Sequence, residues 1–315
     1  MISTLSRLSL PPWPVWTAPA ERTLRAMLGE LEGLPITGGE ASVRLSPAGL
    51  ACGRWLAGFS PAGVSAHRLQ GLPERLGMAS ADAQWFRSLW PQARQIGLAL
   101  EQAPGQVVAK VYLEFALPAP DLRARPAQQR QVALQIQSCK WRADLSAPER
   151  TPSGQTEYWR ISGLDGPAMV ALLREDEGLS NDLRAVYAGV ADCLALAMRT
   201  APYWRDPRLL TVREPGSARR GVGLRLYGSE LKVSAALAPL KPLCERWGLD
   251  LSQHPAVLSA WAQQEWGWIH AGQDRQGQGF VIVYGALSRA QTRAVLAAAG
   301  SAALRQQASV QESWT

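Results

Sequence analysis

Hydrophobic and polar positions alternate one by one in several segments of the chain, as they do in β-strands that turn one face toward a core. In the segment over residues 107–117, Lys110, Tyr112 and Glu114 fall on one face, and hydrocarbon side chains fall on the other. Two later segments repeat the motif of a residue two places before a tyrosine, namely Arg225-Leu-Tyr227 and Ile282-Val-Tyr284. The pattern predicts strands whose apolar side is covered by helices and whose polar side faces a functional space.

The same alternation, with Pro- and Gly-containing turns between the segments, predicts strands along most of the chain. They are expected over residues 41–45, 50–59, 64–70, 107–117, 131–141, 158–161, 209–213, 222–228, 266–271 and 279–287. Apolar positions three and four apart predict helices between the groups of strands. These helices are expected over residues 20–33, 80–102, 167–174, 179–199, 230–247, 254–264 and 289–306.

Strands that follow one another in pairs joined by short turns are antiparallel. A long antiparallel sheet with helices on one face only is stable if it closes, because closure removes its unpaired edges. About ten strands around such a barrel leave a lumen wide enough to hold a ligand. The expected fold class is therefore α+β, with a closed antiparallel β-barrel of about ten strands surrounded by helices in repeated αββα units.

Composition supports a folded protein without a membrane segment. Apolar residues make up 47% of the chain and charged residues 19%, as in globular proteins. The four cysteines are widely spaced without a CxxC motif, and the N-terminus lacks the apolar region of a signal peptide. We therefore expect a cytoplasmic protein with reduced thiols. All 315 residues are expected to form a single domain, with an extended lead-in over 1–19 and a mobile tail over 307–315.

The net charge of +7 comes mostly from arginine, which suits the recognition of phosphate or carboxylate groups. The basic stretch from Arg205 to Arg220 keeps a nucleic-acid-binding protein as an alternative, although only Tyr203 and Trp204 supply aromatic rings near it. The three histidines do not have the spacing of a zinc site. The sequence also lacks a P-loop, a strand-to-helix GxGxxG and a GxSxG elbow, which disfavours nucleotide-dependent enzymes and triad hydrolases.

The order of elements, together with Lys110-Val-Tyr112, Arg225-Leu-Tyr227 and Val283-Tyr284, resembles the soluble aromatic prenyltransferases of the αββα (ABBA) barrel type. The resemblance spans roughly residues 40 to 300 and lies in architecture more than in motifs. It implies an enzyme that transfers a prenyl group from dimethylallyl or geranyl diphosphate to an aromatic acceptor, such as an indole, a phenol or a peptide side chain. A non-catalytic barrel that binds a small molecule in the same lumen is a further alternative.

The resemblance also implies roles for side chains on the polar faces. Glu114 is expected to remove the proton from the acceptor, and its alternative is a salt bridge to an arginine of a neighbouring strand. No DDxxD-type motif is present, so no cofactor is expected to be required, although magnesium could accompany the diphosphate. The diphosphate is expected to be held by cations and hydroxyl donors at Lys110, Arg225, Arg68, Tyr112, Tyr227 and Tyr284.

The segment Trp266-Gly-Trp268-Ile-His270 places two indoles and an imidazole on one face of a regular strand. Trp266, Trp268 and His270 are therefore expected to form a wall that binds the acceptor, with His270 as a proton shuttle. The alternative is a packed barrel strand whose histidine makes an ordinary hydrogen bond.

Overall fold

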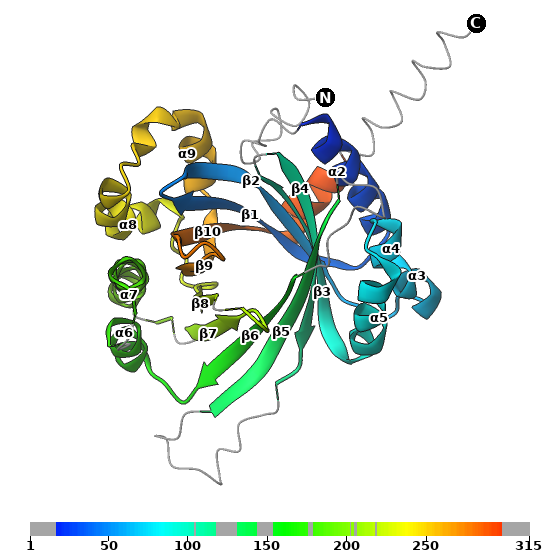
Figure 1. Ribbon diagram of the computed structural model, residues 1–315, viewed down its shortest axis with the longest axis horizontal. Helices are drawn as coiled ribbons and strands as arrows, with labels where there is room; N and C mark the ends of the chain where they lie inside the picture. The colour runs from blue at the N-terminus through cyan, green and yellow to red at the C-terminus, as the bar shows by residue number, and fades with distance from the viewer. Residues whose placement is uncertain are drawn as a thin grey trace, which may run out of the picture.

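The computed structural model describes residues 17–103, 105–117, 131–143, 154–175, 179–201, 203–204, 207–217 and 219–297. Within these ranges, ten strands form one closed antiparallel barrel in which each strand pairs with its neighbours in sequence and β1 pairs with β10 (Figure 1). The strands are β1 (Ile36–Ser46), β2 (Gly49–Phe59), β3 (Ala93–Ala103), β4 (Gln106–Phe115), β5 (Gln131–Arg142), β6 (Gly154–Ser162), β7 (Arg208–Arg213), β8 (Arg220–Arg225), β9 (Glu265–Gln273) and β10 (Gly279–Leu287). The predicted closed barrel is confirmed.

The described helices lie outside the barrel in two groups (Figure 1). One group packs near β2, β3 and β4, and it consists of α2 (Ala18–Leu31), α3 (Ala66–Gln70), α4 (Leu72–Arg75) and α5 (Ser80–Leu89). The other group packs near β7 to β10, and it consists of α6 (Gly166–Arg174), α7 (Asn181–Thr200), α8 (Ser234–Arg246) and α9 (Pro255–Ala262). No helix in the described part of the chain is long and apolar enough to span a bilayer.

The chain ends are only partly described. A helix over residues 289–297 follows β10, and the rest of the predicted final helix lies outside the described residues. Residues 1–16 of the expected lead-in and the whole of the expected tail over 307–315 also lie outside them.

Strand β4 has the predicted division of its two faces. Val111 and Leu113 are fully buried in the core between barrel and helices. Lys110 and Tyr112 point the other way and line the lumen. The outer face of the barrel is therefore apolar and the lumen is polar, which is the reverse of a simple globular protein. This arrangement is possible because the helices keep water from the outer face.

The prediction of a strand over 64–70 is wrong, because this segment forms the helix α3. The Ser65 hydroxyl caps the helix by accepting a hydrogen bond from the backbone N–H of Arg68. Such a local cap stabilises the first turn of a helix. The single buried side chain of the helix, Leu69, is fully covered by the outer core.

The prediction of one long helix over 80–102 is also wrong, because the helix ends at Leu89 and β3 begins at Ala93. Trp90-Pro91-Gln92 forms a short 3₁₀ turn between them, and proline cannot continue an α-helix in its interior. Ile96 and Leu100 are four residues apart, which fits a helix as well as the outer face of a strand. The number of strands is still ten because β3 takes the place of the strand expected over 64–70.

The position of Leu98 on β3 leads to a test of this assignment. Leu98 is fully buried against the helices, whereas its neighbour Ala99 faces the lumen. Leu98→Ala should lower the free energy of unfolding by about 2–5 kcal/mol, because it leaves a cavity in the outer core. Ala99→Ser should change it by less than about 1 kcal/mol. Denaturant unfolding of both variants measures these values, and equal losses would contradict the strand.

Candidate functional site

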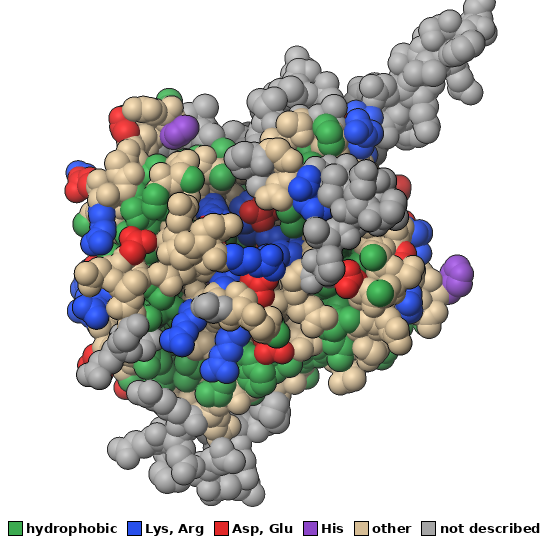
Figure 2. Space-filling model, in the orientation of Figure 1, with side chains coloured by type: hydrophobic (Ala, Val, Ile, Leu, Met, Phe, Trp, Pro, Cys, Tyr) green, Lys and Arg blue, Asp and Glu red, His purple; other side chains and the backbone are tan. Residues whose placement is uncertain are grey.

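The lumen consists of two compartments that meet at a waist of aromatic rings. The cationic compartment, about 350 Å³, is lined at its outer end by the β9–β10 turn. The mixed compartment, about 530 Å³, lies toward the end of the barrel where β3 begins and β10 ends. Four residues line both compartments, and they define the waist: Tyr112, Tyr158, His270 and Tyr284. Figure 2 shows Lys and Arg side chains gathered in the hollow at the centre of one face of the molecule.

Cationic side chains dominate the first compartment because alternate positions of several strands point into it. Lys110 on β4 lies directly opposite Lys140 on β5 in the strand register. Like charges in directly opposite positions destabilise a sheet unless an anion lies between them. The described cations that line this compartment are Arg44, Arg54, Lys110, Lys140, Arg142, Arg219 and Arg275.

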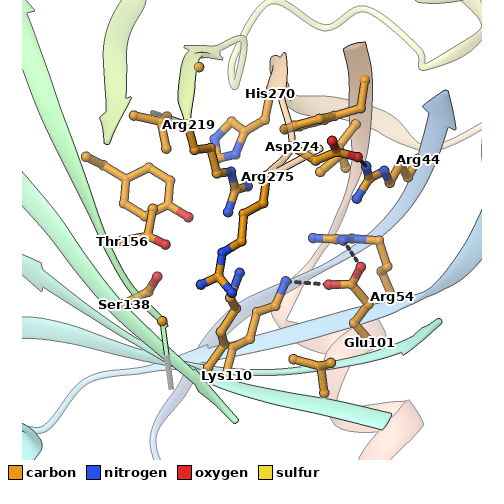
Figure 3. A pocket seen from close by; sticks show the side chains of 18 of the residues that line it. Arg44, Arg54, Glu101, Lys110, Ser138, Thr156, Arg219, His270, Asp274 and Arg275 are labelled. Atoms are coloured by element: carbon orange, nitrogen blue, oxygen red, sulfur yellow. Dashed lines mark hydrogen bonds and ion pairs between the residues drawn. The ribbon is translucent and has the colours of Figure 1, made fainter. Parts of the chain in front are cut away.

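Carboxylates hold several of these cations in place (Figure 3). The carboxylate of Glu101 on β3 forms ion pairs with two of them, the guanidinium of Arg54 at 2.5 Å and the ammonium of Lys110. Asp274 in the β9–β10 turn pairs with Arg44 at 3.1 Å. The cations are therefore oriented by short-range contacts before any ligand binds, which is the arrangement that electrostatic catalysis requires.

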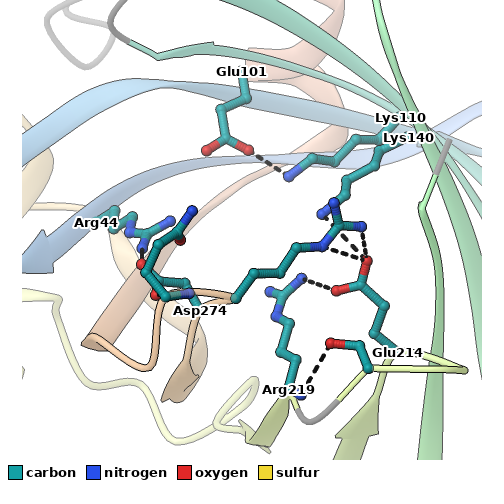
Figure 4. Close-up of polar contacts among 10 residues, drawn as sticks. Arg44, Glu101, Lys110, Lys140, Glu214, Arg219 and Asp274 are labelled. Carbon is teal, nitrogen blue, oxygen red and sulfur yellow. Dashed lines mark hydrogen bonds and ion pairs between the residues drawn. The ribbon is translucent and has the colours of Figure 1, made fainter. Parts of the chain in front are cut away.

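Glu214, which directly follows β7, forms a second network at the edge of the same compartment (Figure 4). Its side chain is only 3% exposed, and it contacts Arg219 at 3.5 Å, Lys140 at 4.0 Å and the guanidinium of Arg275. The contact with Arg275 connects the end of β7 to the β9–β10 turn. Burial opposes the ionisation of Glu214, but the hydrogen bond from Arg275 and the nearby cations lower the pKa of this carboxyl.

The ion pair of Lys110 and Glu101 at the centre of the compartment has one partner with a strongly lowered pKa and one that stays ionised. Burial, and then the charge of Arg54, lower the pKa of Lys110 to about 7. Burial also opposes the charge of Glu101, but Arg54 and Lys110 outweigh it and keep the pKa of this carboxyl well below its usual range. Glu101 is thus ionised near neutral pH, while Lys110 lies at the midpoint of its titration.

The waist consists of aromatic groups whose rings contact one another. The ring centroids are 6.2 Å apart for Tyr112 and Tyr158, 5.6 Å for Tyr158 and His270, and 5.1 Å for His270 and Tyr284. Burial, and then the charge of Arg54, lower the pKa of His270 to about 3, so the imidazole carries no charge at neutral pH. Burial also raises the pKa values of Tyr112 and Tyr284, which keeps both phenols protonated.

The mixed compartment contains a buried carboxyl, Glu40 on β1, which accepts a hydrogen bond from the hydroxyl of Tyr227. Burial raises the pKa of Glu40 to about 7, although this hydrogen bond favours the ionised form. Glu114 lies in the same compartment and has two partners, the guanidinium of Arg94 and the side-chain amide of Gln135 at 3.1 Å. The two carboxyls therefore differ, since Glu114 is held by a cation and Glu40 is held by a neutral phenol.

The structure brings some of the predicted site residues together and separates others. Lys110 lies in the cationic compartment, and Tyr112 and Tyr284 lie in the adjoining waist. Arg225 and Tyr227 line the mixed compartment on the other side of the waist, with the Arg225 guanidinium 5.2 Å from the centroid of the Tyr227 ring. Five of the six predicted diphosphate residues, all except Arg68, therefore share one lumen but lie in two compartments.

Arg68 does not lie in the lumen, because its segment is a helix outside the barrel. Its guanidinium donates to the backbone oxygens of Glu30 and Glu32 near the C-terminal end of α2. These carbonyls are among those that a helix leaves without internal partners. Arg68 therefore connects two outer helices, and it is remote from any diphosphate in the barrel.

The prediction that Trp266, Trp268 and His270 share one face is wrong for Trp266. Trp268 pairs with Tyr284 and Trp266 pairs with the next residue of β10, so Gly267 is the extra residue of a β-bulge. A bulge of one residue moves the side chains beyond it to the opposite face. Trp266 is fully buried in the outer core, whereas Trp268 and His270 line the lumen.

Sequence reasoning missed several residues of the site. Arg44 lies on the alternating polar face of the strand predicted over 41–45, so its direction could have been inferred. Glu101 was hidden by the helix predicted over its segment. Lys140 was missed because Gln135 is the extra residue of a bulge in β5, after which even-numbered residues face the lumen. Tyr158 and Glu40 carried no signal beyond single positions in short or unrecognised strands.

The described arginines of the basic stretch from Arg205 to Arg220 do not all face the same side: Arg213 and Arg220 are exposed, and two others face the lumen. Arg219 lines the cationic compartment and Arg208 lines the mixed compartment, so both point into the barrel. Arg205 lies outside the described residues. Among the residues described, no group of three or more His, Cys, Asp or Glu side chains could hold a metal ion.

Comparison with known proteins reveals similarity in structure but not in sequence. No family model matches the chain, and no curated protein matches it. The structure of AnaPT from Neosartorya fischeri is similar with a TM-score of 0.46 and 13% identity over 80% of this chain and 78% of that one. The structure of NotF in complex with brevianamide F and DMSPP is similar with a TM-score of 0.45 and 14% identity over 79% of each chain. A second structure, of NotF prenyltransferase, is similar with a TM-score of 0.43 and 12% identity over 79% of this chain and 80% of that one.

The class of fold follows from the strand order itself. The chain is a closed, ten-stranded antiparallel barrel with helices outside it, which is the ABBA type of barrel. The chemistry of the lumen must be inferred from its own side chains, because the similarities above are similarities of overall form.

The buried carboxyl of Glu40 leads to a test of the electrostatics. Because the folded protein raises its pKa from the ordinary 4.5 to about 7, wild type should lose stability as pH rises through this interval. Glu40→Gln removes the charge and keeps an acceptor for Tyr227. The free energy of unfolding of this variant minus that of wild type should therefore be up to about 3 kcal/mol larger at pH 8 than at pH 5. Denaturant unfolding at both pH values measures the difference, and a pH-independent difference would contradict the raised pKa.

Proposed function

We propose that the protein transfers a prenyl group from an allylic diphosphate to an aromatic acceptor inside the barrel. The observation that carries this proposal is the meeting of a cationic compartment with a mixed, partly aromatic compartment at a waist of neutral rings. A reaction that separates a diphosphate from a carbocation needs these three environments in this order.

The cationic compartment suits the diphosphate. Among the described residues, seven cations line it and three carboxylates contact them, so a net positive charge is left for a polyanion. Arginine forks and lysine ammonium groups bind phosphate oxygens well. When the C–O bond of the substrate breaks, both bonding electrons leave with the diphosphate, and the fixed cations stabilise the charge that develops on it.

The waist suits the allylic cation that remains. Tyrosine and tryptophan rings attract a cation through their faces, by roughly 0.5–2 kcal/mol per contact. The neutral imidazole of His270 does not repel the cation, as an imidazolium would. The rings also exclude water, which would otherwise trap the cation as an alcohol.

The mixed compartment suits the acceptor and the base. An aromatic carbon of the acceptor attacks the allylic cation to form a new C–C bond, and the resulting ring cation loses a proton to restore aromaticity. We assign this proton to Glu40, because its carboxyl is buried, is held by a neutral hydroxyl and has a pKa of about 7. Glu114, the base expected from the sequence, is the alternative, but its carboxylate already bonds to Arg94 and Gln135.

The proposal is tested by incubating the protein with dimethylallyl or geranyl diphosphate and a panel of indoles and phenols. Mass spectrometry should detect the prenylated acceptor, and one pyrophosphate should be released for each acceptor modified. Binding of both substrates with neither product would favour the non-catalytic alternative. Stabilisation by single-stranded DNA, and not by the diphosphates, would favour the nucleic-acid alternative.

Loss of a fixed cation should slow the reaction. Lys110→Ala and Arg54→Met should each lower kcat/KM for the diphosphate at least about 100-fold, because each removes a charge that is oriented before the substrate binds. Lys241→Ala is the matched control, since this lysine on α8 is 75% exposed and remote from the lumen. Initial rates of pyrophosphate release measure the effect. Unchanged rates in both lumen variants would remove the cationic compartment from the mechanism.

The pH dependence of the reaction should be narrow and bell-shaped. Glu40 must lose its proton to act as the base, and Lys110 must keep its proton to bind the diphosphate, and both pKa values are about 7. For the free enzyme, kcat/KM should therefore peak near pH 7 and fall toward about tenfold per pH unit on each side. Glu40→Gln should lower the rate and abolish the fall on the acid side. A profile that is flat from pH 6 to pH 8 would contradict these assignments.

A further inference from the structure

A row of three glycines crosses the wall of the mixed compartment. Gly38 on β1 lies opposite Gly58 on β2, which in turn lies opposite Gly97 on β3. All three line the compartment, and none of them has a positive φ. The backbone therefore does not require glycine here, and glycine weakens the interior of a strand, where a larger side chain would pack better.

Packing does not require glycine at the end of this row either. A Cβ atom at Gly97 would lie 3.4 Å from the Cβ of Tyr112 and 3.7 Å from a methyl of Leu56, which are ordinary contact distances. At Gly58 it would lie 2.5 Å from the amide nitrogen of Gln95 and 3.2 Å from the hydroxyl of Thr37, so these side chains already lie over the backbone there. At Gly97 the missing side chain leaves bare peptide backbone beside Tyr112 and Leu56 on one wall of the lumen. Bare backbone of this kind allows a flat ligand to approach closely.

A second and independent feature of the same compartment is the side chain of Gln135. Its residue is only 1% exposed, and its Oε1 atom has no hydrogen-bond partner. A buried carbonyl without a partner costs stability unless a ligand or water satisfies it. Gln135 is the extra residue of the bulge in β5, and bulges near active sites often redirect a side chain.

The orientation of the Gln135 amide is fixed by its neighbours. The amide nitrogen donates to Glu114 at 3.1 Å, and Glu114 also pairs with Arg94. Because both contacts to this carboxyl come from donors, the nitrogen of Gln135 faces Glu114. The oxygen is then left without a partner, in a residue that lines the compartment.

We propose that Gln135 determines acceptor specificity by accepting a hydrogen bond from a ring N–H or O–H group of a flat aromatic molecule that lies along the glycine row. This inference rests on the proposed function for the identity of the compartment as the acceptor site. It narrows the acceptor to fused-ring indoles and phenols with a free donor. A methylated analogue would leave the Gln135 oxygen without a partner and would bind more weakly.

Two pairs of probes test the donor. Indole and 1-methylindole differ only in the N–H group, and 2-naphthol and 2-methoxynaphthalene differ only in the O–H group. Their affinities are measured by calorimetric titration of protein saturated with pyrophosphate. In at least one pair, wild type should bind the donor compound at least about tenfold more tightly. In Gln135→Met, the ratio of the affinity for the donor compound to the affinity for its methylated analogue should fall to about one.

Gln95→Met is the matched control, because Gln95 lines the same compartment but its amide already donates to the hydroxyl of Thr37 at 3.1 Å. This variant should keep the ratio of wild type. A ratio near one in wild type for both pairs, or a ratio that persists in Gln135→Met, would overturn the proposal. Since the titration needs no turnover, loss of transfer activity with a retained ratio would contradict the proposed function alone.

The glycine row has its own readout, which does not depend on Gln135 variants folding correctly. Gly97→Ala adds one methyl group to the wall at a position where it clashes with nothing in the free protein. It should weaken 2-naphthol binding at least about threefold and leave pyrophosphate binding unchanged. Unchanged affinity for 2-naphthol would show that the ring does not lie on this wall, and it would overturn that part of the proposal.

Discussion

Pairing of β1 with β10 is the constraint on which the rest of the structure depends. It runs from Gly39 opposite Leu287 to Leu45 opposite Val281, and it converts an open sheet into a ring. Closure satisfies the backbone groups of both edge strands. It also brings Ser42 opposite Tyr284 and Arg44 opposite Ile282, so that residues from the two ends of the sequence line one lumen. Without this ladder there would be no enclosed space in which charges could be buried together.

Burial inside the closed barrel has opposite consequences for different groups, depending on their neighbours. Glu101 stays ionised because two cations contact it, whereas burial raises the pKa of Glu40 and the hydrogen bond from Tyr227 offsets only part of that rise. His270 is kept neutral by burial and by nearby Arg54. One enclosed volume can therefore contain a fixed carboxylate, a carboxyl of raised pKa and a neutral imidazole. Polyanion binding and carbocation chemistry require different environments, and the lumen contains both.

The parts of the structure that sequence alone predicts are those with a regular period. The faces of β4 follow from strict alternation, and the closed barrel follows from many antiparallel strands with helices on one side. The failures occur where the period changes within an element. Gly267 and Gln135 each add one residue to a strand, and each reverses the side chains beyond it. Bulges depend on pairing with a partner strand that the local sequence does not identify, so Trp266 could not be separated from Trp268 by pattern.

For the proposed reaction, the separation of the lumen into compartments would direct the reactive cation. After the bond breaks, the diphosphate would stay with Arg54, Lys110 and the other cations. The allylic cation would be left beside the waist, and the fixed positive charges behind the diphosphate would disfavour its movement in that direction. The imidazole of His270 is neutral, and Glu40, which can accept a proton, lines the mixed compartment beyond the waist. In the proposed reaction, the cations that hold the diphosphate lie on one side of the waist and Glu40 lies on the other, and this arrangement sets the direction of transfer.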